Sequence, residues 1–118
     1  MIEVQYYVAE NGRSSFEDWF ASVESSARAR VATAIARLEQ GNTSNLKSVG
    51  SGVHELRLDF GPGYRVYLGP DGPTLIILLI GGTKNRQQQD IETAKGLWEK
   101  YKRSKHEKSS PKRIHKKL

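Results

Sequence analysis

The fold of this chain is decided by one stretch near its middle, Gly52-Val-His-Glu-Leu-Arg57-Leu-Asp-Phe-Gly-Pro-Gly-Tyr-Arg65-Val-Tyr67. Its centre is rich in turn-forming residues and its flanks favour strands, which is typical of a β-hairpin. Strand side chains alternate between the two faces of a sheet. One face of the hairpin is therefore apolar, and the other carries Glu55, Arg57, Arg65 and Tyr67.

The polar face of this hairpin favours an anionic ligand, and phosphate above all. Guanidinium groups stay charged at any physiological pH and bind phosphate in a bidentate manner. If the apolar face of the hairpin meets the core, Arg57 and Arg65 lie together on the side that remains accessible.

The N-terminal half of the chain predicts one strand and two helices. Residues 2–8 alternate and favour a first strand. The pattern Ser14-x-x-Glu17 is typical of a capping box and opens a short helix. A second helix begins at Ser25 or Ser26 and ends at Gly41, forming a helical hairpin with the first. Residues 42–52 are expected to be a polar loop.

The C-terminal half predicts the rest of the sheet and one more helix. The run from Thr74 to Ile80 shows no alternation, so we expect a central strand buried on both faces. A third helix is expected from about Arg86 to Tyr101. The order β-α-α-β-β-β-α indicates an α+β fold. We expect a small antiparallel-rich sheet with the helical hairpin and the C-terminal helix on one face, and the other face partly open.

Composition and charge predict one domain with a basic extension. The chain has 118 residues and a net charge of +6. Basic and acidic residues balance within 1–102, so the excess lies in 103–118. We expect a folded domain over 1–102 and a disordered tail over 103–118. The tail is expected either to contact nucleic acid by charge or to act only as a solubilising extension.

Several classes of site and location are excluded or disfavoured. The chain has no cysteine, and its three histidines lack metal-binding spacing, so we expect no metal and no cofactor. The N-terminus does not resemble a signal peptide, and the longest apolar run is too short to span a membrane. We expect a soluble, cytoplasmic protein.

The order of elements and a set of short motifs resemble the RelE/ParE superfamily of toxins, and most closely its HigB-like "addiction module killer" members. The likeness covers roughly residues 1–102. The motifs are Leu46-Lys47, Val53-His-Glu-Leu-Arg57, Gly61-x-Gly-Tyr-Arg-Val-Tyr67, Gly81-Gly-x-Lys84 and Gln88-x-Asp-Ile-x-x-Ala94.

The resemblance implies the toxin of a type II toxin–antitoxin pair. RelE-like members cut mRNA in the ribosomal A site without a metal, whereas ParE-like members share the fold and inhibit DNA gyrase. Fold therefore does not settle function. The implied partners are mRNA on the ribosome and an antitoxin encoded beside the toxin. That antitoxin is expected to bind DNA, so operator DNA is reached only through it.

Metal-free RNA cleavage gives each candidate residue a role. Arg57 and Arg65 are expected to hold the scissile phosphate, because fixed cations stabilise the charge that develops there. Lys47 and Lys84 are expected to stabilise charge or transfer protons, with Glu55 as a rival base. Tyr67 is expected to stack on a base, and Arg86 to make an accessory RNA contact.

Each residue also has a purely structural interpretation. Arg57 and Glu55 can form a surface ion pair, Arg65 can belong to the fold, and Tyr67 can pack in the core. Two other functions compete with the nuclease: a non-enzymatic gyrase inhibitor and an inactive relic that only binds antitoxin. The nuclease hypothesis requires the charged groups of Arg57, Arg65 and Lys84 to open onto solvent together. It is contradicted if they lie far apart or beneath helices.

Overall fold

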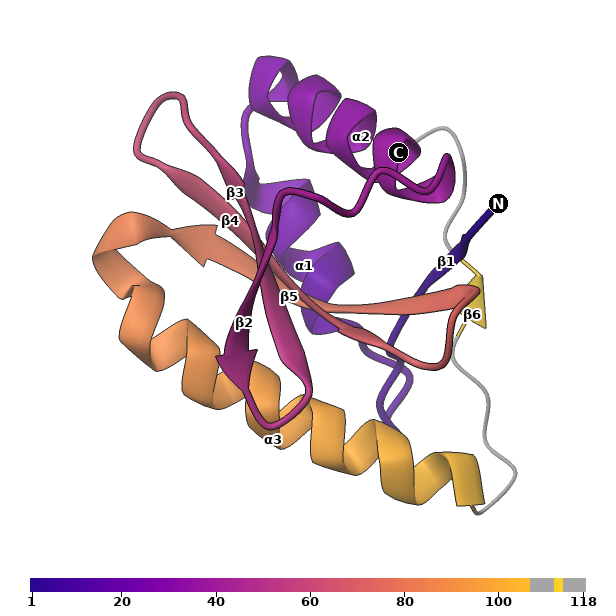
Figure 1. Ribbon diagram of the computed structural model, residues 1–118. Coiled ribbons are helices and arrows are strands. Elements are labelled where there is room, and N and C mark those ends of the chain that lie inside the picture. Colours follow the sequence, from indigo (N-terminus) through magenta and orange to yellow (C-terminus); the bar gives the residue numbers. More distant parts are fainter. Residues whose placement is uncertain (107–111, 114–118) are drawn as a thin grey trace.

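The computed structural model describes residues 1–106 and 112–113 and has an α+β fold, as the sequence predicts (Figure 1). Its elements, in chain order, are β1 (Glu3–Tyr6), α1 (Ser15–Ser22), α2 (Ser25–Glu39), β2 (Leu46–Gly50), β3 (Val53–Leu58), β4 (Tyr64–Pro70), β5 (Leu75–Thr83), the 3₁₀ turn η1 (Lys84–Arg86), α3 (Gln87–His106) and β6 (Lys112–Arg113).

The strands form one mixed sheet in the order β2-β3-β4-β5-β1-β6. β1 runs parallel to β5, and every other neighbouring pair is antiparallel. The predicted β3–β4 hairpin and the central position of β5 are both confirmed. The apolar run of β5 is buried because β4 and β1 flank it and helices cover both of its faces.

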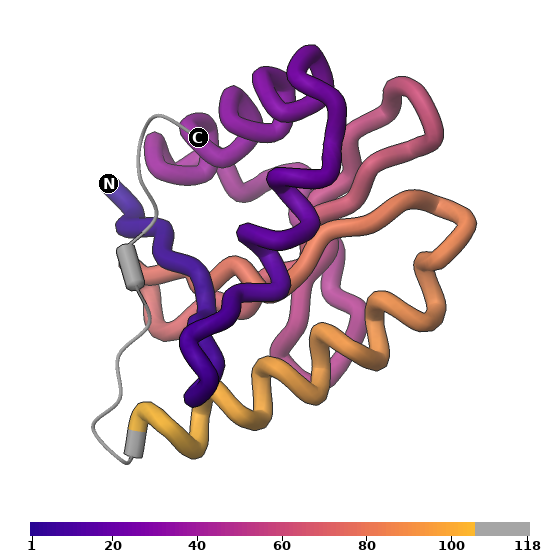
Figure 2. Tube along the Cα trace, turned by 180° about the vertical axis from the view of Figure 1, so that it is seen from behind, coloured from indigo at the N-terminus to yellow at the C-terminus, as the bar shows by residue number. Residues whose placement is uncertain are grey.

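Helices lie on both faces of the sheet, which corrects the expectation of helices on one face only. The α1–α2 hairpin and α3 are separated by the sheet in both views (Figures 1 and 2). Two apolar clusters follow from this layering. The first joins α1 and α2 to residues such as Leu56 and Val66. The second joins Ala94, Trp98 and Tyr101 of α3 to the opposite face of the sheet.

Burial on both faces of β5 explains why α3 lies where it does. Ile76 and Leu78 point into the first cluster, whereas Ile77 and Leu79 point into the second. A strand that is apolar on both faces exposes costly surface unless both faces are covered. α3 supplies the second cover, and the face expected to be open is therefore largely closed.

Two adjacent glycines near the end of β5 allow a close approach of side chains on both faces. A Cβ atom at Gly81 would collide with the Trp19 ring of α1, and one at Gly82 would collide with the Asp90 carboxylate of α3. These glycines are thus explained by packing within the chain, although the sequence equally fits a close approach of ligand to backbone.

The local signals at the first helix are confirmed. Ser14 is the N-cap of α1, and its hydroxyl accepts a hydrogen bond from the Glu17 backbone N–H at 3.1 Å. This cap satisfies one of the free N–H groups of the first turn, next to the favourable negative charges of Glu17 and Asp18.

Three boundaries differ from the sequence-based expectation. The loop expected over 42–52 contains β2, an edge strand with exposed side chains that gives only a weak alternating signal. α3 continues past its expected end at Tyr101 to His106, and Lys105 in this added stretch pairs with Asp71 at 2.8 Å. Residues 112–113 form β6 on the free edge of β1, so that part of the expected tail is strand. Residues 107–111 and 114–118, also expected to be disordered, lie outside the described residues.

No helix within 1–106 combines the length and apolar composition that crossing a membrane requires.

Candidate functional site

The sheet register places the predicted site residues on one face. Lys47 pairs with Glu55, which in turn pairs with Tyr67 on β4. In the neighbouring row Arg57 pairs with Arg65, which pairs with Gly82. Directly paired residues point to the same side of a sheet. The side-chain parity expected from the sequence is therefore confirmed, and the shared face is the one that α3 covers.

Arg65 does not open onto solvent, contrary to the expectation. Its side chain is only 4% exposed, and its partner Glu55 also accepts a hydrogen bond from Gln87 at the beginning of α3. The Arg65 Nε lies 3.5 Å from Glu55 Oε2, and its Nη1 donates a hydrogen bond to the Gly63 carbonyl at 2.9 Å. This burial contradicts the expectation that Arg65 holds the scissile phosphate. Among the predicted catalytic residues it leaves Lys47, Arg57 and Lys84 as the exposed cations.

Glu55 and Tyr67 are also buried and belong to the same internal network. The Tyr67 hydroxyl donates to Glu55 Oε2 at 3.2 Å, and Gln87 Nε2 of α3 donates to the same oxygen at 2.8 Å. The Tyr67 ring is fully covered, so its expected stacking on a base is wrong for this conformation. Glu55 is 1% exposed and engaged by several donors, so it is placed as a structural anion and not as an accessible base.

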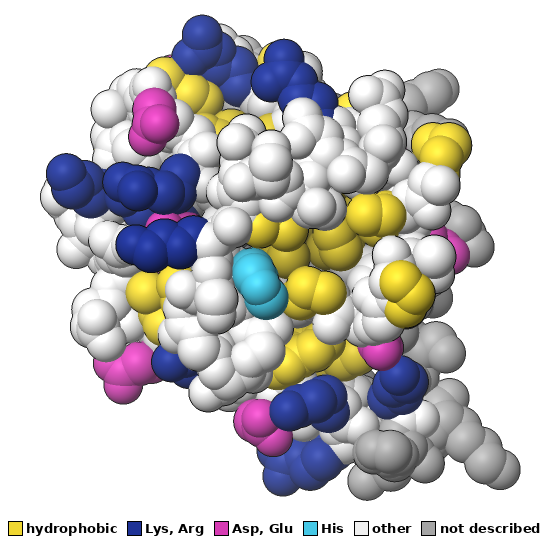
Figure 3. Space-filling view, viewed as in Figure 1, with side chains coloured by type: hydrophobic (Ala, Val, Ile, Leu, Met, Phe, Trp, Pro, Cys, Tyr) yellow, Lys and Arg dark blue, Asp and Glu magenta, His cyan; other side chains and the backbone are white. Residues whose placement is uncertain are grey.

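A group of exposed cations surrounds this buried network, and we call it the cationic rim: Lys47, Arg57, Lys84 and Arg86. Figure 3 shows Lys and Arg side chains gathered at its left edge, over the turn ends of β3 and β4 and the beginning of α3. The Arg57 side chain is 48% exposed and the Arg86 side chain 61%. The cations of the rim therefore lie at the surface, and the Glu55 carboxylate lies below them.

Lys84 stands close to the buried network. A Cβ atom at Gly63 would lie 3.1 Å from Arg65 Nη1 and 3.2 Å from Lys84 Cβ, so the backbone of residue 63 fills the space between them. Among the side chains that the structure describes, no carboxylate pairs with Lys84 or Lys47. Both ammonium groups are therefore available to an anion from solution.

The motif Gln88-x-Asp-Ile-x-x-Ala94 contains Asp90, but no role is predicted for it from the sequence. Asp90 is a second buried carboxylate of this site. It is 4% exposed, and its Oδ2 has no hydrogen-bond donor within the described part of the chain. Burial raises its pKa, and the Arg86 guanidinium, 3.9 Å from Oδ1, opposes that rise. The signal that was available is Gly82: a glycine at the end of a buried strand leaves room for a side chain from the facing helix.

His54 lies on the opposite face of the sheet from Glu55 and Arg57. It lines a hollow of about 340 Å³ together with apolar residues that include Leu46, Leu75 and Ile76. Its Nδ1 is buried and has no hydrogen-bond partner among the described residues. The imidazole is therefore distant from the cationic rim and takes no part in its chemistry.

The arrangement has a simple chemical meaning. The cations at the surface of the site are available to an anion. Beneath them Glu55 compensates the buried Arg65, and Asp90 pairs with Arg86. Because all four residues of the cationic rim carry positive charge, they attract an anionic ligand such as phosphate. The fold and this site define a small α+β protein with a cationic surface at one end of its sheet.

Comparison with known proteins places the chain in a family. It is 44% identical over 84 residues to a protein of Haemophilus influenzae described as an uncharacterized protein; the match covers 70% of this chain and 85% of that protein. The chain therefore belongs to the same family as that protein. No protein-family model matches the chain.

Proposed function

We propose that this protein is the toxin of a type II toxin–antitoxin module and that it cleaves mRNA on the ribosome without a metal. The observation that carries the proposal is the cationic rim: four exposed Lys and Arg side chains at one end of the sheet, two of them lysines without a carboxylate partner among the described side chains. The RelE-like fold is part of the same proposal and rests on the resemblance of the motifs.

Arg57 and Lys84 hold the scissile phosphate in this proposal. The guanidinium of Arg57 offers paired N–H donors to the phosphate oxygens, and the ammonium of Lys84 adds a point charge. Lys84 also stands in η1, directly before α3, where the free N–H groups of a helix start favour an anion. Removing one such group lowers the rate of a charge-stabilised reaction by roughly 10²–10³.

The reaction needs no cofactor from the protein. The 2′-oxygen of the RNA attacks the adjacent phosphorus, the bond from phosphorus to the 5′-oxygen breaks, and the products carry a 2′,3′-cyclic phosphate and a 5′-hydroxyl. One proton leaves the 2′-hydroxyl and one joins the leaving 5′-oxygen. In this proposal Lys47 and Lys84, the two exposed lysines of the rim, exchange these protons.

Arg65 has a positioning role in this account. It is held by Glu55 and by the Gly63 carbonyl, and the backbone of residue 63 lies so near the stem of Lys84 that a Cβ atom there would be 3.2 Å from Lys84 Cβ. The guanidinium therefore fixes the turn on which the site depends without touching the RNA. The antitoxin is expected to neutralise the toxin by covering the cationic rim.

The proposal is tested by expressing variants in a bacterial host and following growth. The chain should arrest growth, and Arg57→Ala together with Lys84→Ala should abolish the arrest while the variant still folds. Arg13→Ala is a matched control, because Arg13 is an exposed cation whose pair with Asp18 lies away from the rim. A double variant as toxic as the wild type contradicts the nuclease and favours gyrase inhibition, and a wild type without toxicity contradicts both.

A further inference from the structure

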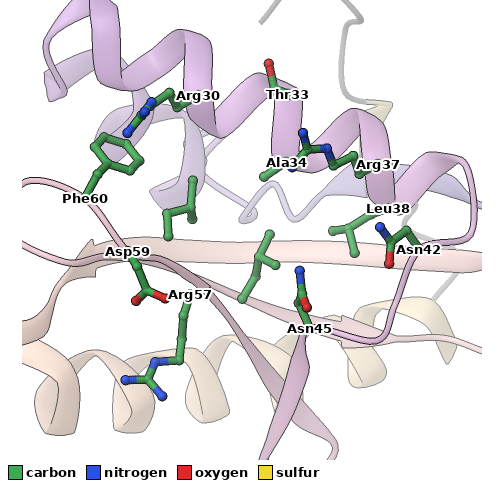
Figure 4. A pocket seen from close by; sticks show the side chains of 12 residues that line it. Arg30, Thr33, Ala34, Arg37, Leu38, Asn42, Asn45, Arg57, Asp59 and Phe60 are labelled. Carbon is green, nitrogen blue, oxygen red and sulfur yellow. The ribbon is translucent and has the colours of Figure 1, made fainter.

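A groove lies between α2 and β3, on the face of the sheet opposite to the cationic rim. Its volume is about 400 Å³. One wall is α2, which contributes Arg30, Thr33, Ala34, Arg37 and Leu38, and the floor and far wall come from residues 56–60 and from the loop before β2. Figure 4 shows Arg30 and Arg37 along the α2 wall, with Asn45 pointing toward them from below.

We infer that this groove binds single-stranded RNA next to the cleaved phosphate, so that the RNA crosses the sheet edge at Arg57. The inference rests on the proposed function and extends it to a second contact surface. The expected occupant is RNA and not an acidic peptide of a partner protein, which a cationic groove also attracts.

Continuity with the cationic rim favours RNA. Arg57 borders the groove, yet its side chain points to the opposite face of the sheet in Figure 4, where the rim lies. β2 covers β3 only as far as Leu56, so no strand separates the two surfaces at Arg57. One chain that passes over this edge meets the rim on one face and the groove on the other.

The charges of the groove suit the phosphates of that chain, because the two arginines of α2 outnumber Asp59, the one carboxylate among the lining residues. Arg30 and Arg37 are exposed, and no carboxylate pairs with either among the side chains of residues 1–105. They stand seven residues apart on α2, or about 10 Å along the axis, and so are far enough apart to bind two different phosphates. Phosphate contacts of this kind supply most of the affinity for RNA and fix its position.

The remaining lining residues suit a nucleobase. The Arg30 guanidinium lies over the Phe60 ring, with its Cζ 4.3 Å from the ring centre, and in this cation–π contact its N–H groups have no carboxylate partner among the described side chains. Unpaired bases in RNA stack on aromatic rings and on guanidinium planes. Asn42 and Asn45 present amide groups, which hydrogen-bond to base edges. The groove is large enough for one base with its sugar.

The test is RNA binding by the full chain as salt is varied. A fluorescent 12-nucleotide single-stranded RNA is titrated with wild type and with Arg30→Ala/Arg37→Ala. Each lost phosphate contact reduces the slope of log affinity against log salt by about 0.7 on single strands. The double variant should therefore show a slope smaller by about 1.4. Arg13→Ala/Lys102→Ala removes the same charge from exposed positions outside the groove and should leave the slope nearly unchanged.

Three outcomes overturn the inference. A double variant with the wild-type slope shows that the groove does not contact RNA, and so does a wild type that does not bind the probe. If the double variant still binds RNA like the wild type but no longer binds an acidic amphipathic peptide that the wild type binds, the groove belongs to a protein partner. Arg37→Ala alone, which leaves the Arg30–Phe60 contact intact, should give half the change and guards against misfolding. The proposed function is tested separately by growth arrest, so a failure of the groove to bind RNA and a failure of the nuclease give different results.

Discussion

Arg57 and Arg65 are directly opposed across β3 and β4, yet one side chain is 48% exposed and the other only 4%. Opposed like charges in a sheet destabilise it unless a counter-charge lies between them. Glu55 provides that charge, because its two oxygens lie 4.0 Å from Arg57 Nε and 3.5 Å from Arg65 Nε. One buried carboxylate thus serves both the exposed cation of the rim and the buried cation beneath it.

Glu55→Gln should lower the free energy of unfolding by about 3 kcal/mol, because it leaves the Arg65 charge buried without its counter-ion. The measurement is urea unfolding followed by tryptophan fluorescence. Arg57→Ala is the matched comparison and should cost less than about 1 kcal/mol, since its pair with Glu55 is half exposed. Equal midpoints for the two variants would show that Glu55 does not stabilise the fold through Arg65.

Gly82→Ala should destabilise the protein by about 1–3 kcal/mol, because its Cβ would meet the Asp90 carboxylate. Thermal unfolding of the variant measures this cost. Gly96→Ala is a control in the middle of α3, where a Cβ meets nothing within 4 Å. That substitution should raise stability by up to about 1 kcal/mol, because alanine favours a helix over glycine. A Gly82→Ala protein as stable as the wild type would contradict the packing of α3 against β5.

Asp90→Asn should change how stability depends on pH. Burial raises the pKa of Asp90 in the folded chain, with Arg86 opposing the shift. The folded state therefore holds this proton more tightly than the unfolded state does. The contribution of Asp90 to stability falls as the pH rises from the unfolded pKa of about 3.9 through the higher folded pKa.

The asparagine variant cannot titrate, so this fall should be absent. Urea midpoints measured from about pH 4 upward should rise more steeply with pH, or decline less, in Asp90→Asn than in the wild type. Parallel pH profiles for the two proteins would mean that the Asp90 pKa is the same in the folded and unfolded chains.

Asp71→Ala should cost about 2 kcal/mol, because this carboxylate joins the β4–β5 turn to the end of α3. It accepts hydrogen bonds from the Tyr101 hydroxyl at 2.5 Å and from Lys105 Nζ at 2.8 Å. Hydrogen bonds that involve a charged group contribute roughly 1.5–3 kcal/mol when partly buried. The control is Glu99→Ala, whose exposed pair with Lys102 should contribute less than about 0.5 kcal/mol.

The pH profile gives a second test of Asp71. Its pKa is lowered by the hydrogen bonds from Lys105 and Tyr101. A carboxylate with a depressed folded pKa stabilises the protein above its unfolded pKa, and this contribution is lost as the pH falls through the folded pKa. Acid unfolding that begins at the same pH in wild type and Asp71→Ala would contradict these contacts.

Side-chain parity in the hairpin could be predicted because a strand repeats every two residues. The register of β3 and β4 places Glu55, Arg57, Arg65 and Tyr67 on one face, as the alternation requires. Their depth could not be predicted from the hairpin alone, because exposure depends on what packs against that face. The signal lay elsewhere: a run from Leu75 to Ile80 that is apolar on both faces requires cover on both, and α3 was the remaining amphipathic helix.

The edge of the sheet was harder to predict. β2 contains only Leu46 and Val49 as apolar residues, and its other side chains face solvent, so its sequence resembles a loop. β6 is paired with β1 through two residues, which leaves no hydrophobic pattern to detect. Asp90 was overlooked because a carboxylate in a first helical turn is ordinarily exposed, and only the contact with Gly82 places it inside.

The measurement that tests the central claim most directly is the mapping of RNA 5′-hydroxyl ends across the transcriptome after a short pulse of expression. The account predicts new 5′-hydroxyl ends inside translated messages, in register with the reading frame, and their loss in Arg57→Ala/Lys84→Ala but not in Arg13→Ala. Intact messages in cells that have stopped growing, or cuts that persist unchanged in the Arg57→Ala/Lys84→Ala protein, would contradict it.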